Sequence, residues 1–227
     1  MCKKIIQLLI FFILSFVLTL FSLEWVSFDP NSTIQNKEPE INYQGSIVTA
    51  NFLGMTRTQK EINEEEYDII NFPIGGTTSN LGMPKLPVSS IYVEVTTNSP
   101  SVNIIYNDYI ILDNYNIVPV QYPKTGGEED DSIPFLKNND FYNMEQFFPE
   151  QIATISTPKI IREHKISQLI LTPIQYNPVK KQLKVFTNIQ LEINGIGNTN
   201  TTKDCIYFDN MLKKLVVNYN LIEDYTS

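Results

Sequence analysis

Short apolar runs separated by polar turn residues fill most of this chain. The alternation is clearest over Lys184–Asn194, where one set of side chains is expected to face the core: Val185, Thr187, Ile189, Leu191 and Ile193. A period of two is typical of a strand with one buried face. Ile166–Thr172 is nearly all apolar or β-branched and predicts a second strand. Because Tyr176–Lys181 supplies turn residues between the two, we expect them to form an antiparallel hairpin in the core.

Earlier segments rich in Ile, Val, Tyr and Phe predict further short strands. These are Ser46–Leu53, Tyr67–Phe72, Val88–Thr96, Val102–Asn107 and Tyr109–Leu112. Phe141–Phe148 predicts a helical turn, and Phe208, Met211, Leu212 and Leu215 recur at the spacing of one short helix. Many short strands with little helix predict an all-β fold, an antiparallel β-sandwich with a short C-terminal helix.

The N-terminal segment has the pattern of an export signal. Lys3 and Lys4 precede the uncharged apolar run Ile5–Leu23, and small residues near Ser22 offer a cleavage site, with a later one at Ser27. The run is long for a signal peptide and close to the roughly 20 residues that span a bilayer. Residues 1–22 are therefore expected to be a signal peptide or an uncleaved signal anchor, with residues 5–23 the only membrane contact if uncleaved. The rest is expected to be secreted, periplasmic or at the cell surface.

The body divides by composition. Residues 23–45 are polar and rich in Pro and Asn, so we expect a flexible leader. Residues 46–195 form the expected β-sandwich, and 196–227 a linker followed by the short helix. Residues 123–140 hold the clearest irregular stretch of the body, and loops of that length are often functional or disordered.

The acidic balance limits the partners. The 227 residues carry 17 Lys and Arg against 25 Asp and Glu, a net charge of −8. Nucleic acid and anionic lipid are therefore excluded as partners. The hydrophobic content of 42% suffices for one sizeable core or two small ones.

The residues that usually carry catalysis are sparse. Cys2 lies in the export segment, so Cys205 alone remains, which excludes a disulfide framework and a multi-thiolate metal site. The single histidine, His164, is expected to pair with Glu163 or a backbone group, and Cys205 to be a small buried apolar residue. The Gly-rich phosphate loop, His-Glu-x-x-His, Gly-x-Ser-x-Gly and Cys-x-x-Cys patterns are missing from the sequence. We therefore expect no enzyme activity and no cofactor.

Charged residues of the long loop offer two further sites. The acidic run Glu128–Asp131 could bind a hard cation such as calcium, but it lacks the alternating spacing of a calcium loop, so we expect a solvated acidic loop and no metal. Lys124 precedes this run and Lys137 follows it. An exposed lysine on such a loop can enter a carboxylate-lined pocket of a partner, although two ordinary solvated lysines remain the alternative.

Two segments carry a family resemblance. They are Gly82–Val95 and Ile166–Ile193, the second combining Pro-x-x-Tyr-Asn-Pro with a long alternating strand. Over roughly 46–195 the chain resembles the N-terminal propeptide of gingipain-like cysteine peptidases, and Tyr207–Asn218 resembles the connector to their catalytic domain. The resemblance implies a β-sandwich that assists folding of the peptidase and keeps it latent by covering its cleft. It also implies a loop that presents a basic residue to the specificity pocket, for which Lys124 and Lys137 are the candidates.

The resemblance also implies a partner. Such precursors continue into a caspase-like catalytic domain with a His and a Cys, for which His164 and Cys205 do not substitute. The expected partner is therefore a gingipain-like catalytic domain, in cis if the chain is a truncated precursor and otherwise in trans. The alternative is an exported β-sandwich for adhesion or carbohydrate binding, since 12 Tyr and 13 Phe suffice to line a sugar platform.

Overall fold

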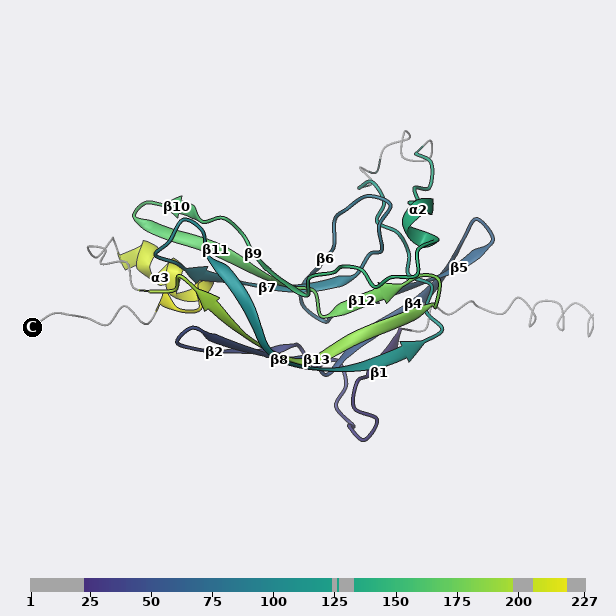
Figure 1. Ribbon diagram of the computed structural model, residues 1–227, viewed down its shortest axis with the longest axis horizontal. Helices are drawn as coiled ribbons and strands as arrows, with labels where there is room; N and C mark the ends of the chain where they lie inside the picture. Colours follow the sequence, from purple (N-terminus) through teal and green to yellow (C-terminus); the bar gives the residue numbers. More distant parts are fainter. Residues whose placement is uncertain (1–22, 124–125, 127–132, 198–205, 220–227) are drawn as a thin grey trace, which may run out of the picture.

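The computed structural model describes residues 23–123, 126, 133–197 and 206–219. Every pairing between its named strands is antiparallel, and the strands form an elongated molecule (Figure 1). The prediction of an all-β antiparallel fold with a short C-terminal helix is confirmed.

The strands form three sheets. The small sheet has the order β1 (Glu24–Ser27), β4 (Gly54–Ile62), β5 (Glu65–Asn71). The second has the order β10 (Lys159–Ile161), β11 (His164–Leu171), β7 (Pro87–Glu94), β6 (Gly76–Thr77), and β9 (Ala153–Ile155) also pairs with β11. The third has the order β12 (Ile174–Asn177), β13 (Gln182–Asn194), β3 (Ile47–Asn51), β2 (Glu40–Gln44), and β8 (Ser101–Asp113) also pairs with β13.

One hydrophobic cluster joins the second and third sheets. It includes Val93 of β7 and Leu169 of β11 from one sheet, and Val48 of β3 and Leu191 of β13 from the other, each with no exposed surface. Two sheets that share one core in this way form a sandwich.

The predicted hairpin between 166–172 and 184–194 is wrong. The strand paired with β13 across the turn is β12, and β11 lies in the other sheet, paired with β7. Between them, Pro173 has no N–H with which to continue the β11 ladder, and the chain crosses there from one sheet to the other.

The predicted alternation of β13 holds except at one bulge. Val185, Ile189 and Leu191 are fully buried, but the register against β8 shifts between Phe186 and Asn188. The extra residue leaves Thr187 only half-buried and buries Phe186 instead. One inserted residue changes which side chains face the core, so a strict period of two fails there.

The range 23–45, expected to be a flexible leader, contains β1 and β2, which pair with β4 and β3. The indole of Trp25 in β1 lies against Gly54 of β4, where an added Cβ atom would collide with the ring. The β1–β4 pairing joins segments far apart in the chain, whereas β2 and β3 form a hairpin around Gly45 and Ser46, and the polar composition of 23–45 reveals neither.

The predicted C-terminal helix is present as α3 (Ile206–Leu215). Leu212, Val216 and Tyr219 form a separate small cluster with Ile166 of β11. The Asn218 side chain accepts a hydrogen bond from the Glu94 N–H (2.7 Å) and donates one to the Glu94 carbonyl (2.9 Å). The segment after the helix is thus fastened to β7 through both backbone groups of Glu94.

His164 is buried and its Nδ1 lies 2.9 Å from Oε1 of Glu94. The expected partner, Glu163 or a backbone group, is therefore incorrect: β11 and β7 are adjacent antiparallel strands, and this brings two buried polar side chains together across the sheet. Cys205 lies outside the described residues. Within those residues, no helix has the length and apolar character needed to cross a membrane.

Candidate functional site

The two ends of the 123–140 stretch meet at one side chain. Gln121 Nε2 donates to the Leu136 carbonyl (2.7 Å), and the Leu136 N–H donates to Gln121 Oε1 (2.8 Å). An amide side chain that both donates to and accepts from one residue's backbone replaces a pair of strand hydrogen bonds. Gln121 therefore closes the base of the loop.

Gly82 forms backbone hydrogen bonds with residues at both ends of the same stretch. Its N–H donates to the Val120 carbonyl (2.9 Å), and its own carbonyl accepts from the Asn138 N–H (3.0 Å). Its φ of +75° favours glycine, and an added Cβ would lie 3.2 Å from the Asn138 nitrogen. The strand-like contact on both sides depends on this residue having no side chain.

A short helix follows the loop directly. The Asn138 side chain caps α2 (Asn139–Tyr142) by accepting from the Phe141 N–H (3.0 Å). Phe141 is buried, and the Tyr142 hydroxyl donates to the Ile117 carbonyl (2.9 Å). Burial raises the pKa of Tyr142 far above its ordinary value, so this hydroxyl stays a donor. Of the predicted helical turn over Phe141–Phe148, only Phe141 and Tyr142 are helical, because the helix begins two residues earlier at Asn139 and ends at Tyr142.

Lys137 lies at the centre of the base. Its Nζ lies 3.1 and 3.0 Å from the two carboxylate oxygens of Glu65 and 3.0 Å from the Tyr67 hydroxyl. It also lies over the rings of Tyr67 (5.3 Å) and Tyr142 (5.0 Å). The side chain is 25% exposed, so these contacts fix the Lys137 amine at the base of the loop.

The cluster stabilises its own charges. Partial burial acts to lower the pKa of Lys137, but the hydrogen bonds with Tyr67 and Glu65 outweigh it and the pKa lies above its ordinary value. Burial acts to raise the pKa of Glu65, but hydrogen bonds from Tyr67, Lys137 and Asn116 outweigh it and the pKa is lowered. Both residues therefore stay charged at neutral pH.

A partly buried ion pair fixes the strand-like segment that leads into the loop. Arg57 Nε donates to Oδ1 of Asp68 (2.7 Å), and the Asn116 N–H donates to Oδ2 (2.7 Å). The backbone of Asp68 bonds on both sides to this segment, from its N–H to Asn116 and from the Val118 N–H to its carbonyl. The approach to Gln121 is thus attached to β5.

Of the site residues predicted from the sequence, the structure describes Lys137 and not the others. Lys137 lies in the cluster just described, whereas Lys124 and the acidic run Glu128–Asp131 lie outside the described residues. Glu65 and Tyr67 were not singled out from the sequence, because no local pattern connects β5 with a lysine 72 residues later. Within the described part of the chain, no group of three or more His, Cys, Asp and Glu side chains is placed to hold a metal.

Comparison with known proteins identifies the domain. The Propeptide_C25 family model matches residues 29–225. Gingipain R2 of Porphyromonas gingivalis is 30% identical over 156 residues, which cover 65% of this chain and 21% of that protein. Lys-gingipain of the same species is 22% identical over 156 residues, covering 66% of this chain and 9% of its own length. The chain therefore corresponds to about a fifth or less of these relatives.

Two solved structures share the fold. The complex of the Porphyromonas gingivalis RgpB pro- and mature domains contains a chain with a TM-score of 0.67 and 26% identity, covering 81% of this chain and 97% of that one. The structure on zymogenic latency of gingipain K from the same species has a TM-score of 0.63 at 20% identity, with 78% and 100% covered. The match of the family model over most of the chain, together with the RgpB likeness, shows that the chain belongs to the Propeptide_C25 family and is a propeptide domain of the gingipain type rather than a catalytic domain.

Proposed function

We propose that this domain keeps a gingipain-like cysteine peptidase latent, and assists its folding, by covering the active-site cleft. The observation that carries the proposal is the doubly fixed base of the loop, closed by Gln121 and held by the Lys137–Glu65 contact. A loop whose ends are fixed loses less conformational entropy when it enters a cleft, which favours tight binding. The RgpB relative, solved as a complex of pro- and mature domains, supports a peptidase partner.

Lys124 and Lys137 are the proposed inhibitory residues, and they differ in what binding would require. A basic side chain that enters a carboxylate-lined pocket exchanges water for charge-assisted hydrogen bonds. Lys137 would first have to leave Glu65 and Tyr67, so its use by a partner would open the base of the loop. On these contacts Lys137 serves better as an anchor, and Lys124 is the first candidate to test.

The proposal also places the domain outside the cytoplasm, as part of a secreted, periplasmic or cell-surface system. Its support is the charged-then-apolar pattern of residues 1–22 together with the gingipain relatives. The peptidase partner acts in cis in a longer precursor or in trans as a separate chain.

The test is inhibition by the full chain of a gingipain-like peptidase from the same organism, with mature RgpB in parallel. We expect activity to fall at micromolar concentrations of the chain, and the Lys124→Ala variant to inhibit at least about tenfold more weakly. Lys159→Ala, an exposed lysine of β10, serves as the control and should inhibit like the unaltered chain. An active peptidase that is unaffected at micromolar concentrations would count against the proposal, and glycan binding without inhibition would favour the adhesion alternative.

A further inference from the structure

β8 is a long strand with one paired edge. Every one of its 13 residues except Ile105 pairs with β13, from Ser101 opposite Asn194 to Asp113 opposite Gln182, and Ile105 is left out of the register at an irregularity. Among the described residues, β13 is the only strand that pairs with β8. The N–H and C=O groups that point away from β13 therefore form an open template for another strand.

The side chains of β8 are apolar on both faces. Directly opposed residues share a face, so Ile104, opposite Leu191, belongs to the core side, and Tyr106, opposite Gln190, belongs to the outer side. The large apolar residues of this strand that stay exposed are Ile104, Ile105, Tyr106, Tyr109 and Ile111, at 39–53%. A strand whose side chains are apolar on both faces is typically covered on both faces in a folded protein.

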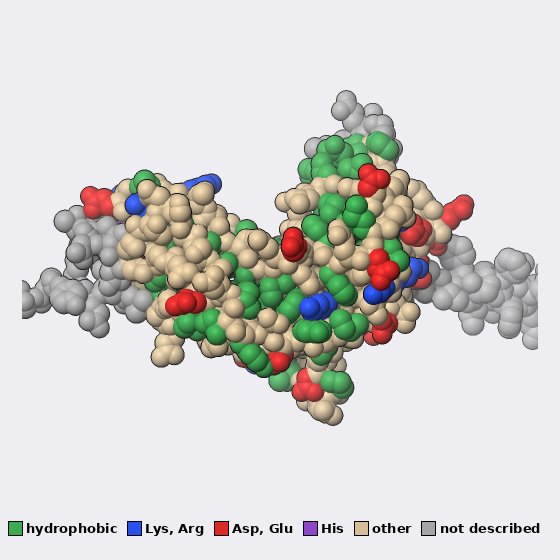
Figure 2. Space-filling view, in the orientation of Figure 1, with side chains coloured by type: hydrophobic (Ala, Val, Ile, Leu, Met, Phe, Trp, Pro, Cys, Tyr) green, Lys and Arg blue, Asp and Glu red, His purple; other side chains and the backbone are tan. Residues whose placement is uncertain are grey.

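β8 lacks the lysines and prolines with which proteins most often protect an edge, although it carries Asp108 and Asp113 and two irregularities in its register with β13. Between Ser101 and Asp113 there is no Lys, Arg or Pro. Figure 2 shows hydrophobic side chains gathered along the middle of the visible face, over β8 and β13. An exposed patch of this kind on a soluble domain marks an interaction surface.

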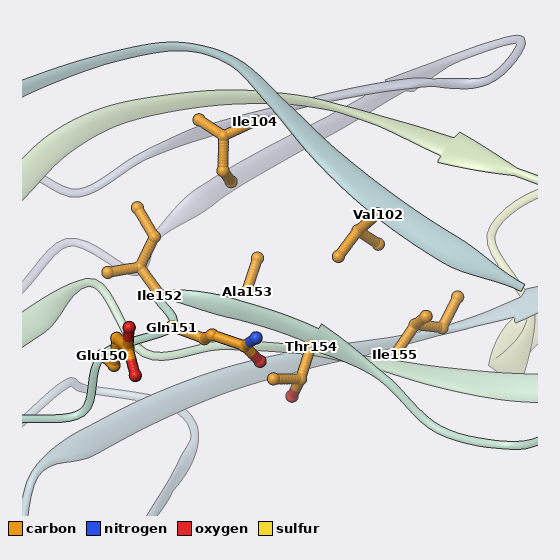
Figure 3. Close-up of a pocket in the computed structure, with 8 residues that line it drawn as sticks. All are labelled: Val102, Ile104, Glu150, Gln151, Ile152, Ala153, Thr154 and Ile155. Carbon is orange, nitrogen blue, oxygen red and sulfur yellow. The ribbon is translucent and has the colours of Figure 1, made fainter.

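A groove adjoins the first half of the strand. It has a volume of about 540 Å³ and lies between Val102 and Ile104 of β8 and the segment Glu150–Ile155, which includes β9. Figure 3 shows Val102, Ala153 and Ile155 directed into the space between the two strands. The volume falls within the roughly 300–1,000 Å³ typical of ligand pockets, so side chains of an added strand can be accommodated there.

The charges around the edge of β8 indicate which kind of partner segment can bind there. Asp108 and Asp113 lie on β8 and Glu150 lies at the groove, whereas the nearby cation Lys184 lies over the Tyr109 ring (4.1 Å). A second copy of the chain would bring the same carboxylates and a net charge of −8. The complementary partner is therefore an extended segment with alternating apolar residues and at least one Lys or Arg.

We propose that the edge of β8 and its groove receive such a segment from the partner peptidase as an additional antiparallel or parallel strand. This inference rests on the proposed function, and it adds a second contact that is separate from the loop base. Backbone hydrogen bonds would supply affinity, the groove would take alternate apolar side chains, and a basic residue near Asp108 would fix the register.

The test compares two matched Ile→Lys variants of the full chain. Ile105→Lys places a charge on β8, and Ile160→Lys makes the same change on β10, where Ile160 is 68% exposed. A second β8 variant, Ile111→Lys, repeats the test if Ile105→Lys has a lowered thermal midpoint. We expect the β8 variants to bind the gingipain-like peptidase from the same organism at least about tenfold more weakly, with Ile160→Lys unchanged.

Binding is measured together with self-association by sedimentation. If the unaltered chain binds the peptidase and the folded β8 variants bind it equally well, the proposed strand contact is overturned while the proposed function stands. If the unaltered chain does not bind the peptidase, both fail. If the β8 variants only dissociate a homodimer, the occupant is a second copy and the inference is wrong.

Discussion

The amine of Lys137 and the carboxylate of Glu65 meet at 3.0 Å across 72 residues of sequence. The contact joins the end of the long loop to β5, and Tyr67 and Asn116 add hydrogen bonds to the same carboxylate. One acidic side chain thus connects the loop base, the small sheet and the segment that precedes the loop.

The Glu65→Gln variant should lose stability at neutral pH by up to about 1 kcal/mol, because both partners are partly exposed and exposed ion pairs contribute little. The folded-state pKa of Glu65 is lowered below its ordinary 4.5, so its contribution is present above that value and is lost as pH falls through the folded pKa. Thermal midpoints of the two proteins should therefore converge in acid. Glu145→Gln, which removes the exposed contact with Lys180, is the control and should change the midpoint less.

The Asp68→Ala variant should be far more damaging than Glu65→Gln. The Asp68 side chain is 4% exposed, and its removal leaves Arg57 Nε and the Asn116 N–H without this acceptor, while the other end of the guanidinium keeps the Asn114 carbonyl. Arg57 is 20% exposed and water can partly replace Asp68, so the cost should lie below the about 3–5 kcal/mol of a fully buried pair. Urea denaturation measures this, and adding Arg57→Met to the variant should recover part of the loss. A double variant no more stable than Asp68→Ala would show that the charge of Arg57 is not the cause.

The Gln121→Leu variant should open the loop base with little change in volume. It leaves the N–H and C=O of Leu136 without the Gln121 partners, at a cost of about 1–3 kcal/mol. Limited proteolysis should then cut faster between residues 121 and 138. The matched control, Gln146→Leu, removes an exposed side chain whose amide donates to the Met144 sulfur, and it should be cut at the original rate.

The Asn218→Ala variant should release the C-terminal segment from β7. Asn218 is 4% exposed and bonds to both backbone groups of Glu94, so its loss leaves buried groups unsatisfied. Hydrogen exchange should increase over residues 206–219 while β13 keeps its protection. Asn210→Ala, an exposed change in α3, should leave exchange unaltered.

Local pattern was sufficient for some elements. The alternation of β13 and the helical spacing of Phe208 and Leu212 each identified an element, because one buried face of a single strand or helix leaves its period in the sequence. The Propeptide_C25 family was also recognisable, since the Pro173–Pro178 motif and the long strand after it are adjacent in the chain.

Contacts between distant segments were not accessible in this way. Three features depend on which strands become neighbours in the fold. They are the pairing of β1 with β4, the pairing of β11 with β7 instead of β13, and the Glu94–His164 contact. The Lys137 site was predictable only in part for the same reason. The sequence identified the lysine as a candidate, but its partners Glu65 and Tyr67 become its neighbours only in the fold.

The incorporation of β1 into the small sheet has a consequence for maturation. The bond between Ser27 and Phe28 follows directly on the four pairs that β1 makes with β4, and the Phe28 N–H donates to the Leu53 carbonyl (2.9 Å). A processing enzyme needs an extended, unpaired substrate, so in the folded domain this later cleavage site is protected by the sheet. Export processing at Ser27 would have to precede folding and would remove Trp25 with its strand, whereas processing at Ser22 leaves every strand in place.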